Sequence, residues 1–501
     1  MSQTDCAATL SHHRVFSWLA PRIGLGLALA VLADLLFLDG PAPALSLVFF
    51  LALLGMAAAV LNPVRATRNR IIAASVIFVA GLLTLLVEAS ALSYLLALLA
   101  TAIFIAAINH GGALRLAAWA PRAAVLPFLG PFRLLGDLLR ASRLTRMKRT
   151  AFSFASLVSW ILPVAALILF GLLLADGNPL LENWFGFLLA LQFIDWAWGR
   201  HLLFGLFILC LIWPLIHFRR TAPKRAARAP VAPTLAGNDP LLGAAAMARS
   251  LILLNALFAL QSATDFVFLW GGMALPERMS YAAYAHRGAY PLVLTALLAA
   301  LFVLLAMRKG GPAERSTLIR PLVLVWIGQN ILLVISSIFR LKLYVAAYSL
   351  TELRVAAFIW MILVAAGLTL IVVQILRGHS NAWLLEMNAR ALALALFGAA
   401  LLNIPAIVAN YNIAHCREAG GEGPSLDYYY LWSLGPQTIP ALDAIAHAVP
   451  AALGQDQYMR AQLARMASSE DWRRWDYRSW RLRRYLAIHK DDGPVPPSSV
   501  N

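Results

Sequence analysis

The chain has 501 residues, of which 61% are hydrophobic and only 13% are charged, and its formal net charge at pH 7 is +17. A soluble domain carries about a quarter charged residues, so this composition excludes an ordinary soluble protein. Repeated apolar runs of roughly twenty residues are long enough to cross a bilayer as helices. The predicted fold is therefore all-α, a polytopic transmembrane helix bundle.

Eleven apolar segments are predicted to span the membrane. They lie at 22–38, 44–61, 71–88, 91–109, 152–175, 201–218, 250–270, 289–307, 321–339, 355–376 and 391–409. With a cytoplasmic N-terminus, most of the 41 Lys and Arg residues fall on the inner side, which matches the positive-inside rule. This orientation leaves a small C-terminal tail outside.

The first span has some features of a secretory signal peptide. A basic start and an apolar stretch precede "APA" at 42–44, which is typical of a cleavage site. Asp34 interrupts the apolar stretch, which favours a retained span. Asp34 stands alone near the outer end of this span, and a structural role is the simpler interpretation.

The segments along the chain suggest six regions. They are a four-span group at 1–110, a basic cytoplasmic amphipathic segment at 111–150, two spans with an interfacial outer helix at 151–218, a basic cytoplasmic linker at 219–249, a five-span core at 250–409 and a periplasmic tail at 410–501. Within the second region "FRLLGDLLRASRL" has the periodicity of a helix lying on the inner headgroups. Residues 180–198 are apolar enough to span, but three tryptophans and the charge asymmetry favour an interfacial helix.

The basic clusters indicate lipid partners rather than nucleic acid. "RATRNR", "RASRLTRMKR" and "RRTAPKRAAR" contain almost none of the aromatic residues that a nucleic-acid groove uses. Anionic headgroups at the cytoplasmic face are the expected partners. Cys6, Cys210 and Cys416 are not placed to form a disulfide framework. No cofactor and no metal site are expected.

The tail after Asn410 differs from the rest of the chain in being polar. It is too poor in aliphatic residues for a large core, and we expect it to pack on the membrane face through Trp472, Trp475 and Trp480. "SSEDWRRWDYRSWRLRRYLA" predicts a helix capped by Ser468 or Ser469. A periplasmic protein is a possible partner for this tail.

The sequence contains no Walker loop, G-x-S-x-G, H-E-x-x-H or C-x-x-C motif. Candidate site residues are therefore polar residues placed where lipid makes them costly. Asp265 in span seven is the best of these, with Gln261 one turn below it on the same face. Arg340, at the outer end of span nine, has the right depth to pair with Asp265. Two interpretations stay open: a cation, proton or polar-ligand site, or a structural ion pair.

Two outer loops are predicted to surround Asp265. The first holds three tyrosines and His286 between 281 and 290. In the second, Tyr344, Tyr348 and Glu352 recur at every fourth residue and are expected to form one helical face. Interfacial aromatic anchors are the alternative. The complete set of pocket candidates is Asp265, Gln261, Tyr281, Tyr284, His286, Arg340, Tyr348, Glu352 and Arg354.

The same loops carry a family resemblance. "YAAYAHRGAYP" at 281–291, followed by Tyr348-x-Leu350-Thr351-Glu352-x-Arg354, resembles bacterial membrane proteins grouped as domain of unknown function 4173 (DUF4173) and its relative 4153 (DUF4153). "DYYYLWSLGPQTIPAL" is similar to the outer tail of that family. The resemblance implies a multi-pass protein of the bacterial inner membrane with a soluble outer tail and no assigned activity. Tyr290 departs from the family pattern, which argues against an essential hydroxyl there.

Three function classes follow from these residues. The first is binding or transport of a small molecule or ion through an outward-facing polar pocket among spans seven to ten. The second is a non-catalytic scaffold or regulator that binds a partner through the tail. In the third, a membrane-embedded transferase or hydrolase on a lipid-linked substrate, His286 or Glu352 would be the general base and Arg340 or Arg354 would hold a phosphate or carboxylate. Whether the protein is an enzyme stays open.

Overall fold

The computed structural model describes residues 20–40, 43–109, 115–144, 196–217, 244–267, 318–448, 460–466 and 471–489. Every regular element within these ranges is helical, and eight helices are long and apolar enough to cross a membrane. They are Ala20–Leu38, Arg68–Val87, Ala91–Asn109, Trp198–Ile216, Ala245–Asp265, Ile319–Tyr348, Glu352–Arg377 and Asn381–Leu401. The protein is thus all-helical, and its apolar helices indicate a membrane protein.

Some predicted elements fall outside the described ranges. The spans at 152–175 and 289–307 are among them. Of the interfacial helix predicted at 180–198, only residues 196–198 are described, as the start of a longer helix.

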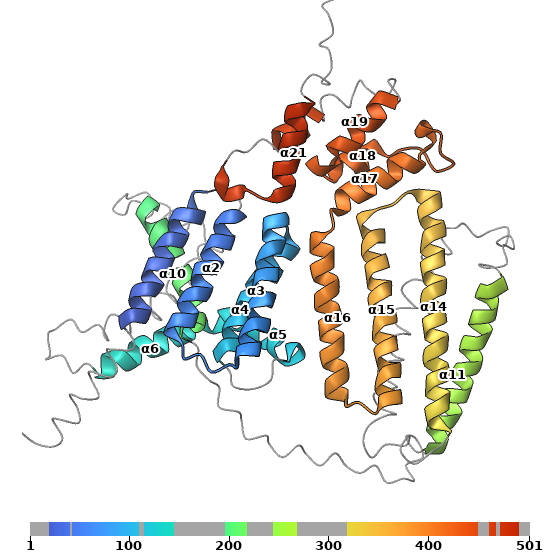
Figure 1. Ribbon diagram of the computed structural model, residues 1–501, viewed down its shortest axis with the longest axis horizontal. Coiled ribbons are helices and arrows are strands. Elements are labelled where there is room, and N and C mark those ends of the chain that lie inside the picture. Colours follow the sequence, from blue (N-terminus) through green and yellow to red (C-terminus); the bar gives the residue numbers. More distant parts are fainter. Residues whose placement is uncertain are drawn as a thin grey trace, which may run out of the picture. The chain divides into compact units, whose positions relative to one another are not determined.

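The chain divides into two compact units, each drawn in Figure 1. The first comprises Met1–Arg220 with Glu470–Asp476, and the second comprises Thr221–Ser469 with Tyr477–Asn501. The first unit contains the helix Ala20–Leu38, which ends in the π-helical turn η1 (Asp34–Leu38), then α2 (Leu45–Leu61), α3 (Arg68–Val87), α4 (Ala91–Asn109), α5 (Leu116–Val125), η2 (Pro127–Leu129), α6 (Gly130–Leu144), α10 (Trp196–Ile216) and η7 (Trp472–Arg474). The second contains α11 (Ala244–Asp265), α14 (Ile319–Tyr348), α15 (Glu352–Arg377), α16 (Asn381–Leu401), α17 (Ile404–His415), η4 (Arg417–Ala419), α18 (Tyr428–Ser433), η5 (Pro436–Thr438), α19 (Ile439–Ala448) and α21 (Tyr477–Ile488).

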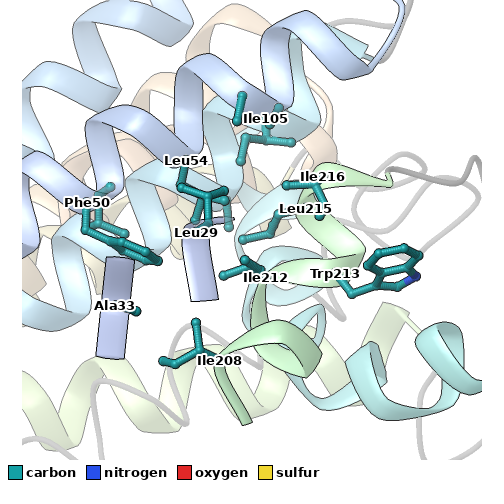
Figure 2. Close-up of a cluster of buried hydrophobic side chains, with 14 of the residues drawn as sticks. Leu29, Ala33, Phe50, Leu54, Ile105, Ile208, Ile212, Trp213, Leu215 and Ile216 are labelled. Atoms are coloured by element: carbon teal, nitrogen blue, oxygen red, sulfur yellow. The ribbon is translucent and has the colours of Figure 1, made fainter. Parts of the chain in front are cut away.

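The core of the first unit lies where α10 meets the helix Ala20–Leu38 and α2. Figure 2 shows Leu29, Leu54 and Ile212 meeting there, and these buried side chains belong to one apolar cluster. Lipid tails are as apolar as leucine, so helices in a membrane associate through close packing and interhelical hydrogen bonds. The packing of these three helices on one another therefore depends on the fit of their side chains.

A buried polar contact holds α6 against α10. The amphipathic helix predicted within 111–150 is present as α6, and its acidic residue Asp137 is only 1% exposed. The Trp213 indole N–H donates to Asp137 Oδ2 over 3.1 Å, and His217 Nδ1 lies 2.8 Å from the same oxygen. A buried carboxylate needs such partners because burial removes its hydration. The single acid of this basic segment therefore faces protein.

Gly130, the first residue of α6, makes this close packing possible. A Cβ atom at Gly130 would lie 1.8 Å from the Cys210 backbone oxygen, whereas one at Gly136 would meet no atom of the described residues within 4 Å. We expect Gly130→Ala to lower the free energy of unfolding by about 1–3 kcal/mol, the usual cost of overpacking. Gly136→Ala in the same helix should raise it by up to about 1 kcal/mol. Thermal unfolding of both variants tests this contrast, and equal melting temperatures would contradict it.

Asp34 is not solitary, contrary to the expectation from the sequence. His201 Nδ1 of α10 lies 2.7 Å from Asp34 Oδ2, and Arg200 forms an exposed ion pair with Asp39 at 2.8 Å. The partners are about 160 residues away in sequence, so periodicity within the first span could not reveal them. The structural role assigned to Asp34 is compatible with this contact.

In the second unit α11, α14, α15 and α16 lie side by side (Figure 1). α11 and α14 run parallel, because Asn255 Nδ2 donates to the Leu322 carbonyl near the start of α14 while Asp265 meets Arg340 near its end. α15 and α16 form an antiparallel hairpin, closed at Gly378 with φ 67°. These 26- and 21-residue helices are long enough to cross a bilayer.

The last predicted span is wrong in its position. The apolar pattern placed it at 391–409, but α16 covers Asn381–Leu401 and a separate helix, α17, begins at Ile404. The Asn403 side chain accepts a hydrogen bond from the Ala406 N–H, and Pro405 occupies the first turn of α17. An asparagine cap followed by proline starts a helix, and a proline inside a continuous span would interrupt its hydrogen bonds.

The tail has a small core of its own, and its expected packing on the membrane face stays a prediction. Eleven buried side chains from residues 409–482, among them Leu431, Trp432 and Leu482, form one cluster. Asp443 accepts two hydrogen bonds from the Arg460 guanidinium, at 2.6 and 2.9 Å. Of the tryptophans expected at the membrane, Trp472 and Trp480 are 55% and 40% exposed. The short helices gather beyond the ends of α14, α15 and α16 (Figure 1).

The helix predicted to begin at Ser468 or Ser469 begins later. Residues 472–474 form a short 3₁₀ turn, η7, whose cap is Asp471, and α21 starts only at Tyr477. Asp471 accepts from the Arg473 N–H over 2.9 Å and also pairs with its guanidinium. The turn ends at Trp475, whose ψ of 127° is not helical, so the charge pattern that predicted one helix belongs to two elements.

Candidate functional site

Asp265 and Arg340 form a buried ion pair between α11 and α14. Asp265 is 2% exposed and Arg340 is 9% exposed, and an Arg340 guanidinium nitrogen donates to Asp265 Oδ1. Gln261 Nε2 donates to the same oxygen over 3.1 Å. The pairing that the sequence suggested from depth alone is therefore present. Removing both charges from water is costly, and their close contact offsets that cost.

Polar side chains continue from this pair along the seam between α11 and α14. Gln329 Nε2 donates to the Asn255 backbone carbonyl over 3.2 Å, so this side chain joins the two helices. Four buried oxygens of the seam receive no hydrogen bond from any described residue. They are Asn255 Oδ1, Ser262 Oγ, Gln329 Oε1 and Asp265 Oδ2. Buried acceptors of this kind are normally satisfied, by water or a ligand where protein groups do not serve.

The three residues expected on one face at the end of α14 do not share a helix. Tyr344 and Tyr348 do, and their ring centroids lie 5.0 Å apart. α14 ends at Tyr348, however, and Glu352 begins α15 after a short turn. The Thr351 side chain caps α15 by accepting from the Arg354 N–H over 3.3 Å. The four-residue spacing thus continues by chance through a helix boundary.

Arg354 is used to close this turn. Its guanidinium lies 4.3 Å from the centroid of the Tyr344 ring and donates to the Tyr348 carbonyl over 2.6 Å. It also donates to the Ser349 carbonyl. The carbonyls at a helix end lack intrahelical partners, and an arginine there satisfies them. These contacts favour a structural role over the phosphate- or carboxylate-binding role considered from the sequence.

Ser349 has an unusual backbone conformation, with φ 66° and ψ 168°. This region is populated almost only by glycine, and other residues there cost about 1–3 kcal/mol. We expect Ser349→Gly to raise the free energy of unfolding by about 1 kcal/mol. Ser337→Gly, in the interior of α14, should lower the free energy of unfolding by about as much. Chemical unfolding of both variants tests this, and a destabilised Ser349→Gly would contradict the strained turn.

The tail clamps this turn from two sides. The buried Asn412 amide accepts from the Leu350 N–H over 2.6 Å and donates to the Leu350 carbonyl over 2.9 Å. The Tyr430 hydroxyl accepts from the Glu352 N–H over 2.8 Å. Burial raises the pKa of Tyr430, so the hydroxyl stays protonated at neutral pH. Neither contact was predicted from the sequence, in which the polar residues of α17 and "DYYYLW" were the only local signal.

The remaining candidates lie apart or outside the described residues. Tyr281, Tyr284 and His286 belong to the latter group. Tyr348 is 44% exposed at the end of α14. Within the described parts of the chain, no three His, Cys, Asp or Glu side chains lie together as metal ligands would. The structure therefore brings together Asp265, Gln261 and Arg340, and it places Arg354 with the tyrosines at the turn.

Comparison with known proteins gives one family. Residues 71–445 match the family described as Domain of unknown function (DUF4153). The match supports DUF4153, which the sequence motifs suggested as the related family. It does not show membership of DUF4173. No curated protein and no solved structure matches the chain.

Proposed function

Since this chain belongs to the DUF4153 family, whose description assigns no activity, we propose from its geometry that it binds or transports a small polar ligand within the membrane. The proposed site lies on the seam between α11 and α14, at the end where Asp265 meets Arg340. The motifs favour a bacterial inner membrane, and the positive-inside rule favours an outward-facing location for this end.

The observation that carries the proposal is the set of acceptor oxygens without donors. A purely structural ion pair in lipid is expected to have its lone pairs satisfied, because each unsatisfied buried polar group costs about 1–3 kcal/mol. Asp265 Oδ2 and three further oxygens on the same seam receive no donor from the described residues. A bound molecule or a file of water that donates hydrogen bonds would satisfy them.

The chemistry of the seam indicates the class of ligand. Three of the four are amide or carboxylate oxygens that accept hydrogen bonds, and the Ser262 hydroxyl can accept or donate, so the complementary ligand carries hydrogen-bond donors such as hydroxyl or amino groups. Arg340 already neutralises Asp265, which disfavours a bare metal cation at the pair. A solute rich in hydrogen-bond donors, or water carrying a proton, is therefore a better candidate ligand for this site than a metal ion.

A specific contact favours a second function, that of a scaffold or regulator. The tail forms its own core, and Asn412 and Tyr430 attach it to the turn between α14 and α15. A folded domain fixed to a bundle in this way is suited to hold a partner protein. An enzyme is the least supported class, because Arg354 is engaged with backbone carbonyls.

Native mass spectrometry of the purified full-length protein tests the binding proposal. Wild type is expected to carry an additional small-molecule mass that Asp265→Asn loses. Glu386→Gln is the matched control, because Glu386 is also buried and also paired, with Arg390 of its own helix. Fragmentation of the bound species separates a specific ligand from lipids, which both variants should retain. If wild type carries no extra mass, or if Asp265→Asn retains it, the binding proposal is wrong. The scaffold function would then be the better supported one.

The proposed orientation has its own test. Alkaline phosphatase fused after Asn501 in bacterial cells should be active, because the enzyme folds only outside the cytoplasm. A fusion after His379, in the turn between α15 and α16, should be inactive. If the fusion after His379 were active and the fusion after Asn501 inactive, the second unit would have the opposite orientation. That result would contradict an outward-facing site.

A further inference from the structure

The helix α21 has two different faces. Its buried face carries Arg478 and Leu482, each 3% exposed, and Leu482 joins the core of the tail. The Tyr485 hydroxyl donates to Asp443 Oδ2 over 3.1 Å, which extends this attachment. One side of α21 is thus fully used in holding the helix on its own unit.

The opposite face is exposed and combines aromatic with cationic groups. Tyr477 and Trp480 are 46% and 40% exposed, and their ring centroids lie 5.9 Å apart. The Arg484 guanidinium lies 5.8 Å from the centroid of the Trp480 ring. Arg481 is exposed beside them, and Ile488, 70% exposed, ends the face. These residues follow a spacing of three and four, so they form one continuous stripe, and α21 contains no acidic residue.

The start of α21 lies at the level of a membrane boundary. The Arg478 guanidinium donates over 3.4 Å to the Ala400 carbonyl, one residue before α16 ends. α16 is one of the helices long and apolar enough to cross a membrane. The start of α21 therefore lies beside the end of a candidate span, where headgroups would be.

We propose that the exposed stripe of α21 docks on anionic phospholipid headgroups of the leaflet at the end of α16. Tryptophan and tyrosine prefer the headgroup level, where the ring is in apolar surroundings and the polar atom is in water. A helix with such rings, an aliphatic residue and arginines has the composition of interfacial helices. Each arginine close to an anionic surface strengthens binding about fivefold. An acidic protein partner would leave the exposed Ile488 without a function.

The full-length protein in nanodiscs allows a direct test. The exposed Ala487 is changed to cysteine in a Cys6→Ser chain and labelled with an environment-sensitive fluorophore. The parent chain without the new cysteine gives the background. Discs contain phosphatidylcholine alone or phosphatidylcholine with phosphatidylglycerol. With phosphatidylglycerol, we expect quenching by a lipid-borne nitroxide and protection from aqueous iodide. The Arg481→Gln, Arg484→Gln pair should lower the ratio of lipid-facing to water-facing label about 25-fold.

The control is a pair that removes the same charge elsewhere in the tail. Arg417→Gln with Arg465→Gln should leave the labelled position in lipid. If the control pair lowered the ratio of lipid-facing to water-facing label equally, net charge and not the stripe would be responsible. That result would overturn the proposal. Iodide quenching that is the same in both lipid mixtures would overturn it too. Protection from both the nitroxide and iodide would show that protein covers this face of α21, and it would also overturn the proposal.

Discussion

Replacing Arg340 with leucine is expected to lower the free energy of unfolding by about 3–5 kcal/mol, because it leaves Asp265 buried without its charged partner. Gln261 alone cannot offset the lost guanidinium, since it offers one neutral donor to the carboxylate. The melting temperature and the yield of folded protein should both fall. Thermal unfolding in one detergent, with and without the substitution, measures the effect.

A double variant separates the pair from its surroundings. Arg340→Leu with Asp265→Leu removes both charges, and apolar replacement of a buried ion pair is often neutral. We expect this variant to recover most of the stability lost in Arg340→Leu. Its bound small-molecule mass should still be absent, because the acceptor oxygens of Asp265 are gone. Unchanged stability in the single Arg340→Leu variant would mean that the two side chains do not pair in the membrane.

The second large effect is expected at Asn412. Its amide satisfies both the N–H and the carbonyl of Leu350, and the contact is buried. Asn412→Ala leaves two buried backbone groups unsatisfied, at about 1–3 kcal/mol each. We expect a loss of about 2–5 kcal/mol and faster hydrogen exchange at the Leu350 amide. Exchange measured by mass spectrometry on peptides that cover residues 345–355 tests this directly.

Asn410 provides the matched control for that experiment. It lies on the same helix and is exposed, and among the described residues its side chain bonds only to the Ala406 carbonyl of its own turn. Asn410→Ala should leave exchange at Leu350 unchanged. If Asn412→Ala had no larger effect than Asn410→Ala, the tail would not be fixed to the turn through this amide.

The sequence predicted the long apolar helices well and their polar ends poorly. The span at 91–109 coincides with α4, because a long apolar run between polar loops has one obvious helical solution. The span at 391–409 was misplaced because apolar residues continue across the break at Asn403. In lipid the hydropathy of a segment fixes its presence, whereas a cap or proline fixes its limits.

In the candidate site, too, some contacts could be predicted from the sequence and others could not. Asp265 and Arg340 were predictable, because two costly charges at matching depth are expected to meet. Asn412 was not, since its partner Leu350 is 62 residues away and is contacted through backbone atoms that any residue has. The misassigned face at Glu352 has a related cause. Periodicity assumes one continuous helix, and Ser349 with φ 66° ends it.

Two histidine–aspartate contacts, one near each end of α10, restrict how the first unit can move. His201 meets Asp34 at one end of this helix, and His217 meets Asp137 just beyond the other. Sixteen residues separate the histidines, which corresponds to about 24 Å along a helix axis. A piston shift of α10, or a rotation about its own axis, would have to break at least one contact. Any motion in this unit should therefore carry α10 together with α6 and the first helix as one rigid body.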